Sequence, residues 1–358
     1  MQINCFEPDL DKTDLGFLEK CLNSKNLGFG ANVEKFETQF AKFSKHEYNV
    51  AVSSASSAAY MLFDYIYDML GSCNVFTPSL GFVSPAWAAQ KNGHNLIFVD
   101  VDDNLLFDVE DYTKKRMALA KNLKNVPNIL MPVLYGGVSK INSFVEKKKF
   151  FGDEIIVVDS AHCITPSIKA DYVFFSFHPV KPICMSNGGI LSVSTQEEAA
   201  YFKKYRNFGR SPQGDSYDIV QTGFNFYMNN LNASLGLSQL KKAKKNIEKR
   251  KQNFLFLKEN IDQSIGRIID HDADSSYYLA SFIPNKQTGK NLRKKLKNHG
   301  VQSSFHYPPL HKTKHFKRVM NLKNTEHYAT KIVNLPIHQN INIEQILKIT
   351  RLINESNV

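Results

Sequence analysis

The apolar residues of this chain follow two patterns that alternate along most of its length. Continuous apolar runs of a few residues, bounded by glycine, proline or polar residues, are typical of buried strands in a parallel sheet. Between them lie stretches with helical spacing, such as 60–66 and 197–205. Strands that alternate with helices predict an α/β fold with a mostly parallel, mixed sheet. The strand-like runs are 49–52, 75–77, 95–99, 129–134, 155–158, 172–177 and 191–193.

Helical patterns dominate the start of the chain and the region after residue 230. Residues 14–43 carry two amphipathic stripes separated by a glycine turn, which predict two helices. Over residues 231–261 apolar side chains recur every seven positions, which predicts one long helix that links two domains. The pattern beyond it predicts a smaller α+β unit. We therefore expect a large domain over residues 1–240 and a small C-terminal domain over residues 241–358.

The stretch 155–191 gathers the side chains with the most chemistry. Asp159 ends one strand-like run, and His162 follows it closely. Ser176 lies near the end of the next run, and Lys181 follows in a turn. Functional groups in α/β sheets gather at the strand ends. An amine that forms a Schiff base and a carboxylate that holds a pyridine nitrogen protonated are what pyridoxal phosphate (PLP) chemistry requires.

Simpler interpretations remain open at these positions. A lysine after a strand is most often a solvated charge, and an aspartate there is often only a helix cap. The run Ser53–Ala59 contains Ser56 and Ser57 between a strand and a helix. Such a run suits phosphate, because the helix N-terminus and the hydroxyls favour an anion. A serine that caps a buried helix is the alternative.

Composition and charge narrow the class of protein. The net charge is +11, and it is uneven: residues 241–358 hold 23 Lys and Arg against 9 Asp and Glu, whereas residues 1–240 hold 22 against 25. We interpret the basic half as a solvated face, because no nucleic-acid motif accompanies it. The sequence has no apolar run of membrane-spanning length and no signal pattern. Five cysteines without a CxxC pair favour a reduced, cytoplasmic protein without a metal site.

Three motifs resemble those of the DegT/DnrJ/EryC1/StrS sugar aminotransferases. They are Asp159-Ser160-Ala161-His162, Ser176-Phe177-His178-Pro179-Val180-Lys181 and Asn187-Gly188-Gly189-Ile190, and the similarity extends from about Leu27 to near the C-terminus. The resemblance implies the fold-type I PLP aminotransferase architecture, in which a large PLP-binding domain is joined to a small one.

The resemblance also implies a role for each site residue. Lys181 would hold PLP and transfer the proton, Asp159 would pair with the pyridine N–H, and His162 would lie near the phenolic oxygen of the cofactor. By the same match, Ser56, Ser57 and Ser176 would bind the phosphate, and Phe82 would stack on the ring. Asn225 would reach the phosphate of the neighbouring subunit of a homodimer.

The sequence departs from the family pattern at three positions. Ala55 replaces a glycine, Gly81 replaces a threonine, and Tyr227 replaces an arginine, which leaves the charge at that last position in doubt. Because Ala55 lacks the freedom of glycine at positive φ, the serine loop is expected to differ locally.

The resulting expectation is a PLP-dependent aminotransferase. It would move an amino group from L-glutamate to a nucleotide-linked keto-deoxysugar, in polysaccharide or metabolite biosynthesis. A PLP-dependent nucleotide-sugar dehydratase of the same family is one alternative, although some of those enzymes replace the lysine with histidine. A PLP-binding or anion-binding protein without turnover is the other.

Overall fold

A seven-stranded sheet forms the centre of the protein in the computed structural model, which describes residues 2–139, 152, 154–164, 168–211, 217–317 and 320–357. β7 is antiparallel to both of its neighbours, and the other strand pairs are parallel. The mostly parallel, mixed sheet predicted from the sequence is therefore confirmed. In spatial order the strands are β1 (Tyr48–Val52), β7 (Gly189–Val193), β6 (Tyr172–Ser176), β5 (Ile155–Asp159), β4 (Asn128–Leu130), β2 (Asn74–Pro78) and β3 (Asn95–Val99).

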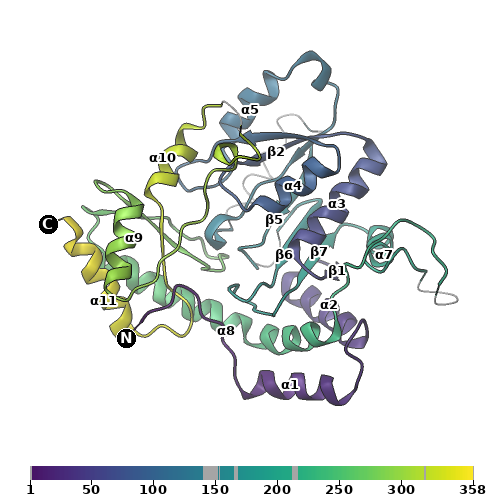
Figure 1. The fold of residues 1–358 in the computed structure, drawn as a ribbon, viewed down its shortest axis with the longest axis horizontal. Helices are drawn as coiled ribbons and strands as arrows, with labels where there is room; N and C mark the ends of the chain where they lie inside the picture. Colours follow the sequence, from purple (N-terminus) through teal and green to yellow (C-terminus); the bar gives the residue numbers. More distant parts are fainter. Residues whose placement is uncertain are drawn as a thin grey trace.

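Helices cover both faces of this sheet, which explains why its strands are continuously apolar. Val157 packs on the face covered by α3 and α4, whereas Ile156 and Val158 pack on the face covered by α2 and α8. The sheet and its helices form the large lobe (Figure 1). Its helices are α1 (Lys12–Asn23), α2 (Ala31–Ser44), α3 (Ala55–Leu70), α4 (Val83–Lys91), α5 (Val109–Met117) and α7 (Gln196–Tyr205), with 3₁₀ turns at Lys121–Leu123 and Tyr135–Gly137.

The long helix α8 (Asn230–Asn260) runs along both lobes, as the seven-residue repeat predicted. Its first half packs on α1 and α2, and Phe254 and Leu257 near its end enter the core of the small lobe. The helix crosses between the two cores without a break, so the domain boundary near residue 240 stays a prediction. The small lobe contains β8 (Gly266–Ile268), β9 (Ala280–Pro284), β10 (Val333–Leu335), α9 (Gly289–Asn298), α10 (Lys323–Lys331) and α11 (Ile343–Asn354), with a 3₁₀ turn at Glu355–Asn357. Another 3₁₀ turn, Leu310–Lys312, packs through Leu310 on the core of the large lobe.

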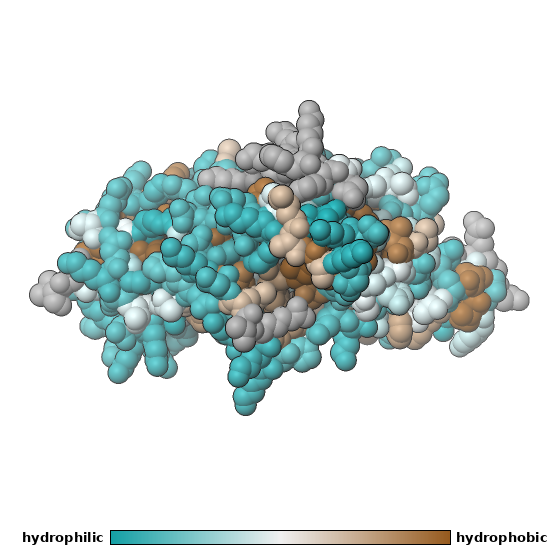
Figure 2. Space-filling model, turned by 90° about the horizontal axis from the view of Figure 1, so that it is seen from above, coloured by the Kyte–Doolittle hydropathy of each residue, from teal (hydrophilic) through white to brown (hydrophobic). Residues whose placement is uncertain are grey.

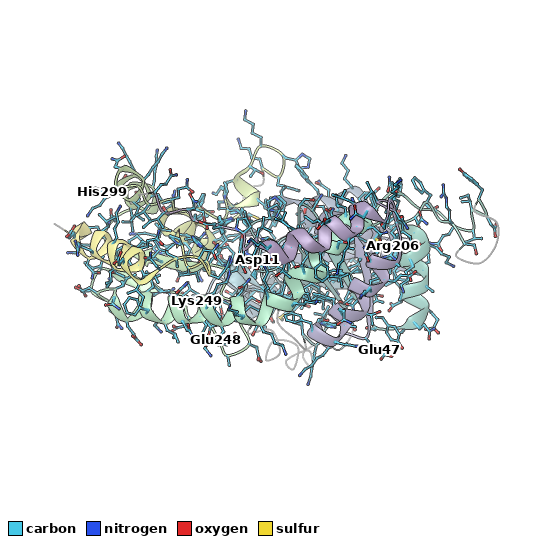
Figure 3. All side chains as sticks on the ribbon, turned by 90° about the horizontal axis from the view of Figure 1, so that it is seen from below. Asp11, Glu47, Arg206, Glu248, Lys249 and His299 are labelled. Carbon is cyan, nitrogen blue, oxygen red and sulfur yellow. The ribbon has the colours of Figure 1, made fainter. Side chains whose placement is uncertain are left out.

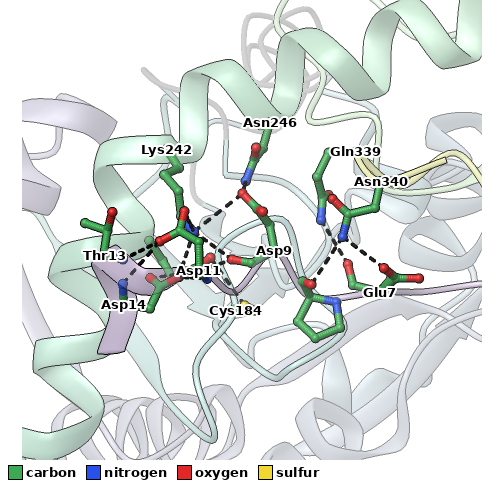
Figure 4. A network of polar contacts seen from close by, with 12 residues as sticks. Glu7, Asp9, Asp11, Thr13, Asp14, Cys184, Lys242, Asn246, Gln339 and Asn340 are labelled. Carbon is green, nitrogen blue, oxygen red and sulfur yellow. Dashed lines mark hydrogen bonds and ion pairs between the residues drawn. The ribbon is translucent and has the colours of Figure 1, made fainter. Parts of the chain in front are cut away.

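The first residues of the chain belong to the small lobe, and both termini lie beside it in Figure 1. Ile3 pairs with Val301 and packs in the small-lobe core. The next residues follow α8, where Lys242 bonds three aspartates of the N-terminal segment (Figure 4). The N-terminal segment thus connects the two lobes a second time, independently of α8.

In the described part of the chain, no helix combines the length and the apolar character needed to cross a bilayer. All five cysteines are buried. Residues 208–211 and 217–224 form the described part of an arm after α7. Arg210 pairs with Ile219 along this arm, and Asn207 pairs with Asn225 at its base.

Candidate active site

Asp159, Ser176 and Lys181 meet at one edge of the large sheet. Asp159 is the last residue of β5, and Ser176 is the last residue of the adjacent β6. Because β5 and β6 are parallel neighbours, their carboxyl ends lie side by side. Lys181 follows β6 after a turn in which its own N–H donates to the carbonyl of His178 at 2.9 Å. The Asp159 and Lys181 side chains are both buried.

Burial controls the charges of the two ionisable groups. Loss of solvation raises the pKa of Asp159 to about 6, and the Ala161 N–H and the Lys181 charge oppose that rise. Loss of solvation lowers the pKa of Lys181 to about 7, with the Asp159 charge opposing the fall. At neutral pH a large share of Lys181 therefore carries a free electron pair, whereas Asp159 is mainly ionised. A nucleophilic amine beside a buried carboxylate is the result.

His162 is buried and neutral next to this pair. Its Nδ1 accepts the N–H of Gly136 at 3.3 Å, so the proton resides on Nε2, which donates to the Tyr307 hydroxyl at 2.9 Å. Burial, with smaller effects from the charges of Lys181 and His306, places the pKa of His162 well below its usual value. Gly136 can present its N–H because it adopts a φ of 68°, which favours glycine. His162 is thus a fixed hydrogen-bonding group.

The serine loop after β1 is shaped as an anion cradle. Ser54 caps α3 by accepting the Ser57 N–H, and the buried Ser57 hydroxyl lies 2.8 Å from Ser53 Oγ and 2.9 Å from Ser54 Oγ. The Ser56 side chain is exposed in the first turn of the helix. Hydroxyls and helix N–H groups at an N-terminus favour phosphate. Ser57 therefore shapes the cradle, and Ser56 offers its hydroxyl outward.

The first residue of β7 also shapes this cradle. A Cβ atom on Gly189 would lie 2.5 Å from the carbonyl carbon of Ser54 and 2.6 Å from the nitrogen of Ala55. Only glycine permits β7 to approach the loop so closely. Ala55 is the first residue of α3 and does not have a positive φ, so alanine adopts the backbone conformation found here without strain.

Three of the predicted site residues lie less deeply. Ser176 is half-buried, and its Oγ accepts the His178 N–H at 3.4 Å. Phe82 follows β2 and is 52% exposed, with its ring centroid 5.7 Å from that of Tyr307. The Asn225 side chain is exposed, and the carbonyl of its neighbour Phe226 accepts the Ser53 N–H at 2.7 Å. The Phe226 backbone thus contacts the serine loop of its own chain, whereas the Asn225 side chain stays exposed.

The small lobe supplies a second wall that the sequence analysis missed in part. Lys181 Nζ lies 4.3 Å from the centroid of the Tyr278 ring, and that ring is 4.7 Å from the His162 ring. Tyr135 donates a hydrogen bond to the carbonyl of His306, and burial lowers the pKa of His306 to about 4. Nothing in the sequence singled out Tyr278.

The buried pair, the fixed histidine and the cradle suit PLP by their chemistry. Lys181 offers the amine, Asp159 the carboxylate, and the serine loop the hydroxyls of an anion site. Gly189 allows β7 to lie close against that loop.

Comparison with known proteins agrees with this geometry. Residues 8–354 match the model of the DegT/DnrJ/EryC1/StrS aminotransferase family. The chain is 26% identical to the UDP-4-amino-4,6-dideoxy-N-acetyl-beta-L-altrosamine transaminase of Campylobacter jejuni, over 94% of this chain and 92% of the relative. It is 24% identical to the spore coat polysaccharide biosynthesis protein SpsC of Bacillus subtilis, over 95% and 93%. The solved structure of the aminotransferase PseC of Helicobacter pylori has a TM-score of 0.91 at 23% identity, with 99% of each chain covered. The expected aminotransferase architecture is therefore confirmed.

Proposed function

Because the chain belongs to the DegT/DnrJ/EryC1/StrS aminotransferase family, a family of PLP-dependent sugar aminotransferases, we propose that it transfers an amino group from L-glutamate to a nucleotide-linked keto-deoxysugar. The observation that carries this proposal is the buried pair of Lys181 and Asp159 at neighbouring strand ends. The name of the Campylobacter jejuni relative, a transaminase of a UDP-linked amino sugar, supports a nucleotide sugar as the substrate.

Each residue has a defined task in this reaction. PLP, when bound, supplies an electron sink for the carbon that loses or gains a proton. Asp159 holds the pyridine N–H by charge. Lys181 would hold the cofactor through Nζ. The same atom would carry the proton, because its lowered pKa permits both protonation states near neutral pH. Ser56 and Ser176 bind the phosphate, with Ser57 as the support of the loop.

A dehydratase remains the second candidate within the family, since Lys181 is compatible with both reactions. A protein that binds PLP without turnover is the third. A single experiment separates an active transaminase from both: the purified yellow holoprotein should bleach when L-glutamate is added, because the amino group moves to the cofactor. A panel of nucleotide keto-sugars should then restore the colour, with release of an amino sugar. A protein that stays yellow with glutamate and every other amino donor is not a transaminase.

We propose that the active site is shared within a homodimer. Asn225 lies at the base of the arm, which projects from the large lobe in Figure 1. The arm exposes Tyr217, Ile219, Val220 and Phe224 to 78%, 55%, 50% and 43%. Figure 2 shows exposed apolar atoms at the end of the molecule where the arm lies. A cluster of this kind is typical of a protein–protein contact, and two-fold symmetry would create two equivalent shared sites.

Subunit mixing tests this proposal. An inactive Lys181→Ala chain mixed with an inactive Asn225→Ala chain should regain part of the activity, because one site of each mixed dimer carries both defects and the other carries neither. A Lys181→Ala chain mixed with a Lys244→Ala chain, altered at an exposed lysine outside the site, controls for subunit exchange. Mixed dimers without activity, or an active monomer, would show that Asn225 serves its own chain.

We also propose a cytoplasmic setting for this reaction, which the burial of all five cysteines fits.

A further inference from the structure

The small lobe carries a groove that is lined by cations and lies outside the candidate active site. It has a volume of about 1220 Å³ and lies between α9, Lys348 of α11, the first residues of the chain and residues 300–303. Its charged side chains are Lys290, Arg293, Lys294, Lys297 and Lys348, and no carboxylate is among its lining residues. We call this feature the basic groove.

The positive charge of the basic groove is not neutralised within the described chain. Lys290, Lys294 and Lys297 are exposed and follow one another at helical spacing along one face of α9. Together with Lys348 they form no ion pair among the described residues. Arg293 donates to the carbonyl of Ile332 at 2.6 Å and packs on Phe305, so its charge is fixed in place. The groove therefore presents several cations to one ligand.

A groove on α8 shows that this arrangement is not a general property of the lysine-rich surface. That groove has a volume of about 470 Å³ and is lined by Lys245 and Lys249 together with Asp9 and Glu248. Figure 3 shows Lys249 and Glu248 on α8 and His299 beyond the end of α9, at the far end of the small lobe. Charges of both signs line the α8 groove, whereas one sign lines the basic groove.

The other lining residues indicate the class of ligand. Four side-chain amides, Gln2, Asn291, Asn298 and Gln302, accompany the lysines. An amide both donates and accepts hydrogen bonds, which suits the N–H and C=O groups of a peptide backbone, whereas a phosphate only accepts. The lining contains no phenylalanine, tyrosine or tryptophan on which nucleobases could stack. A flat bilayer surface would contact only the rim of the groove and would not reach the residues at its floor.

We propose that the basic groove binds an extended segment of a partner protein that is rich in aspartate and glutamate. The lysines pair with its carboxylates, and the amides bond its backbone. This surface lies apart from the aminotransferase site and does not depend on the reaction proposed above.

The test uses the full-length holoprotein and a fluorescent 12-residue peptide of alternating Asp and Glu. The peptide should bind saturably and more weakly as salt is raised, because exposed ion pairs are screened. A Lys290→Gln/Lys294→Gln/Lys297→Gln variant should bind about tenfold more weakly, since it loses three exposed ion pairs that each contribute a factor of about two. A matched Lys244→Gln/Lys245→Gln/Lys249→Gln variant loses the same charge from α8 and should bind within about twofold of the unaltered protein, because it keeps those pairs.

Three results would overturn the proposal. The first is binding of the peptide that does not reach saturation. The second is an equal loss in the two variants, which would mean that only the net charge matters. The third is a stronger, groove-dependent binding of a dT12 oligonucleotide or of phosphatidylglycerol vesicles at the same salt, which would assign the groove to a nucleic acid or a membrane. Circular dichroism of both variants checks the fold, and their transaminase activity should be unchanged.

Discussion

The two walls of the candidate active site differ in the kind of group that they contribute. The large-lobe wall supplies Asp159 and Lys181, which are both ionisable and lie at or just beyond strand ends. The small-lobe wall supplies Tyr278, whose ring faces Lys181 Nζ, and Tyr307, whose hydroxyl bonds His162. The ionisable groups thus come from the sheet, and the tyrosines that enclose them come from the other lobe.

This difference has a physical reason. A buried charge is costly unless it is held by a rigid scaffold and a partner. The central strands provide that scaffold, because β5 and β6 are each bonded to a neighbouring strand on both sides. Residues 306 and 307 of the small lobe lie in a chain segment that reaches the sheet edge through local contacts, such as the 2.7 Å bond between Ser79 Oγ and His311 Nδ1. Substitutions in the two walls should therefore differ in how strongly they affect the enzyme and in which property they change.

The largest expected effect comes from Lys181. Lys181→Ala should lower transamination by about 10⁴-fold, because the same amine holds the cofactor and transfers the proton. Borohydride reduction of the holoprotein followed by peptide mapping should place the label on Lys181. The partly exposed Lys203, which pairs with Glu37 at 3.5 Å, serves as the control and should stay unlabelled. Label on a different lysine would contradict the assignment.

The lowered pKa of Lys181 predicts that the reactivity of its amine depends on pH. In cofactor-free protein its pKa of about 7 lies below the usual 10.5, so the reactive neutral amine forms as the pH rises through about 7. Reductive methylation of Lys181, measured against an exposed lysine by mass spectrometry, should have its midpoint near pH 7. In Asp159→Asn the midpoint should shift lower, because the carboxylate that favours the ammonium is lost. A midpoint near the usual value would mean that Lys181 is solvated.

Asp159→Asn should lower turnover strongly, although less than Lys181→Ala does. The amide cannot hold the pyridine N–H by charge, and removal of such an electrostatic contact costs on the order of 10²-fold in rate. The kcat with a saturating amino donor measures the effect, and the absorbance of bound PLP shows that the cofactor is retained. Near-normal turnover with intact PLP would reduce Asp159 to a structural role.

The two walls were also unequally predictable from sequence. The strand ends could be located because apolar runs end at Asp159 and Ser176, and the order of the motifs resembled a known family. The burial of Lys181 and the position of the Tyr278 ring over it could not be predicted from the sequence. No local pattern reports which residues of another lobe fold back onto a strand end. Likewise Leu15 and Leu22 belong to the apolar stripe that predicted a helix, yet both are exposed on α1. Periodicity locates a helix face and does not say what covers it.

A variant of Tyr278 tests the small-lobe wall at Lys181. Tyr278→Leu removes the ring that faces the ammonium, an interaction of about 0.5–2 kcal/mol. The pKa of Lys181 should fall by roughly 0.4 to 1.4 units, since roughly 1.4 kcal/mol corresponds to one unit. Tyr278→Phe keeps the ring and is the matched control, so its methylation midpoint should stay near that of the unaltered protein. An unchanged or higher midpoint in the leucine variant would show that the ring does not stabilise the ammonium.

The smallest effect is expected at Tyr307. Tyr307→Phe keeps the ring beside Phe82 but removes the oxygen to which His162 Nε2 donates, and a net hydrogen bond contributes roughly 0.5–1.5 kcal/mol. The kcat/KM should fall about 2- to 10-fold on that basis. His162→Leu removes the other partner, so a double variant shows whether the two act together. If they do, Tyr307→Phe has little further effect once His162 is replaced, because the bond is already lost. Losses that multiply would mean that Tyr307 acts on the substrate without His162. The small-lobe wall would then take a direct part in binding, and the division between a reactive and an enclosing wall would fail.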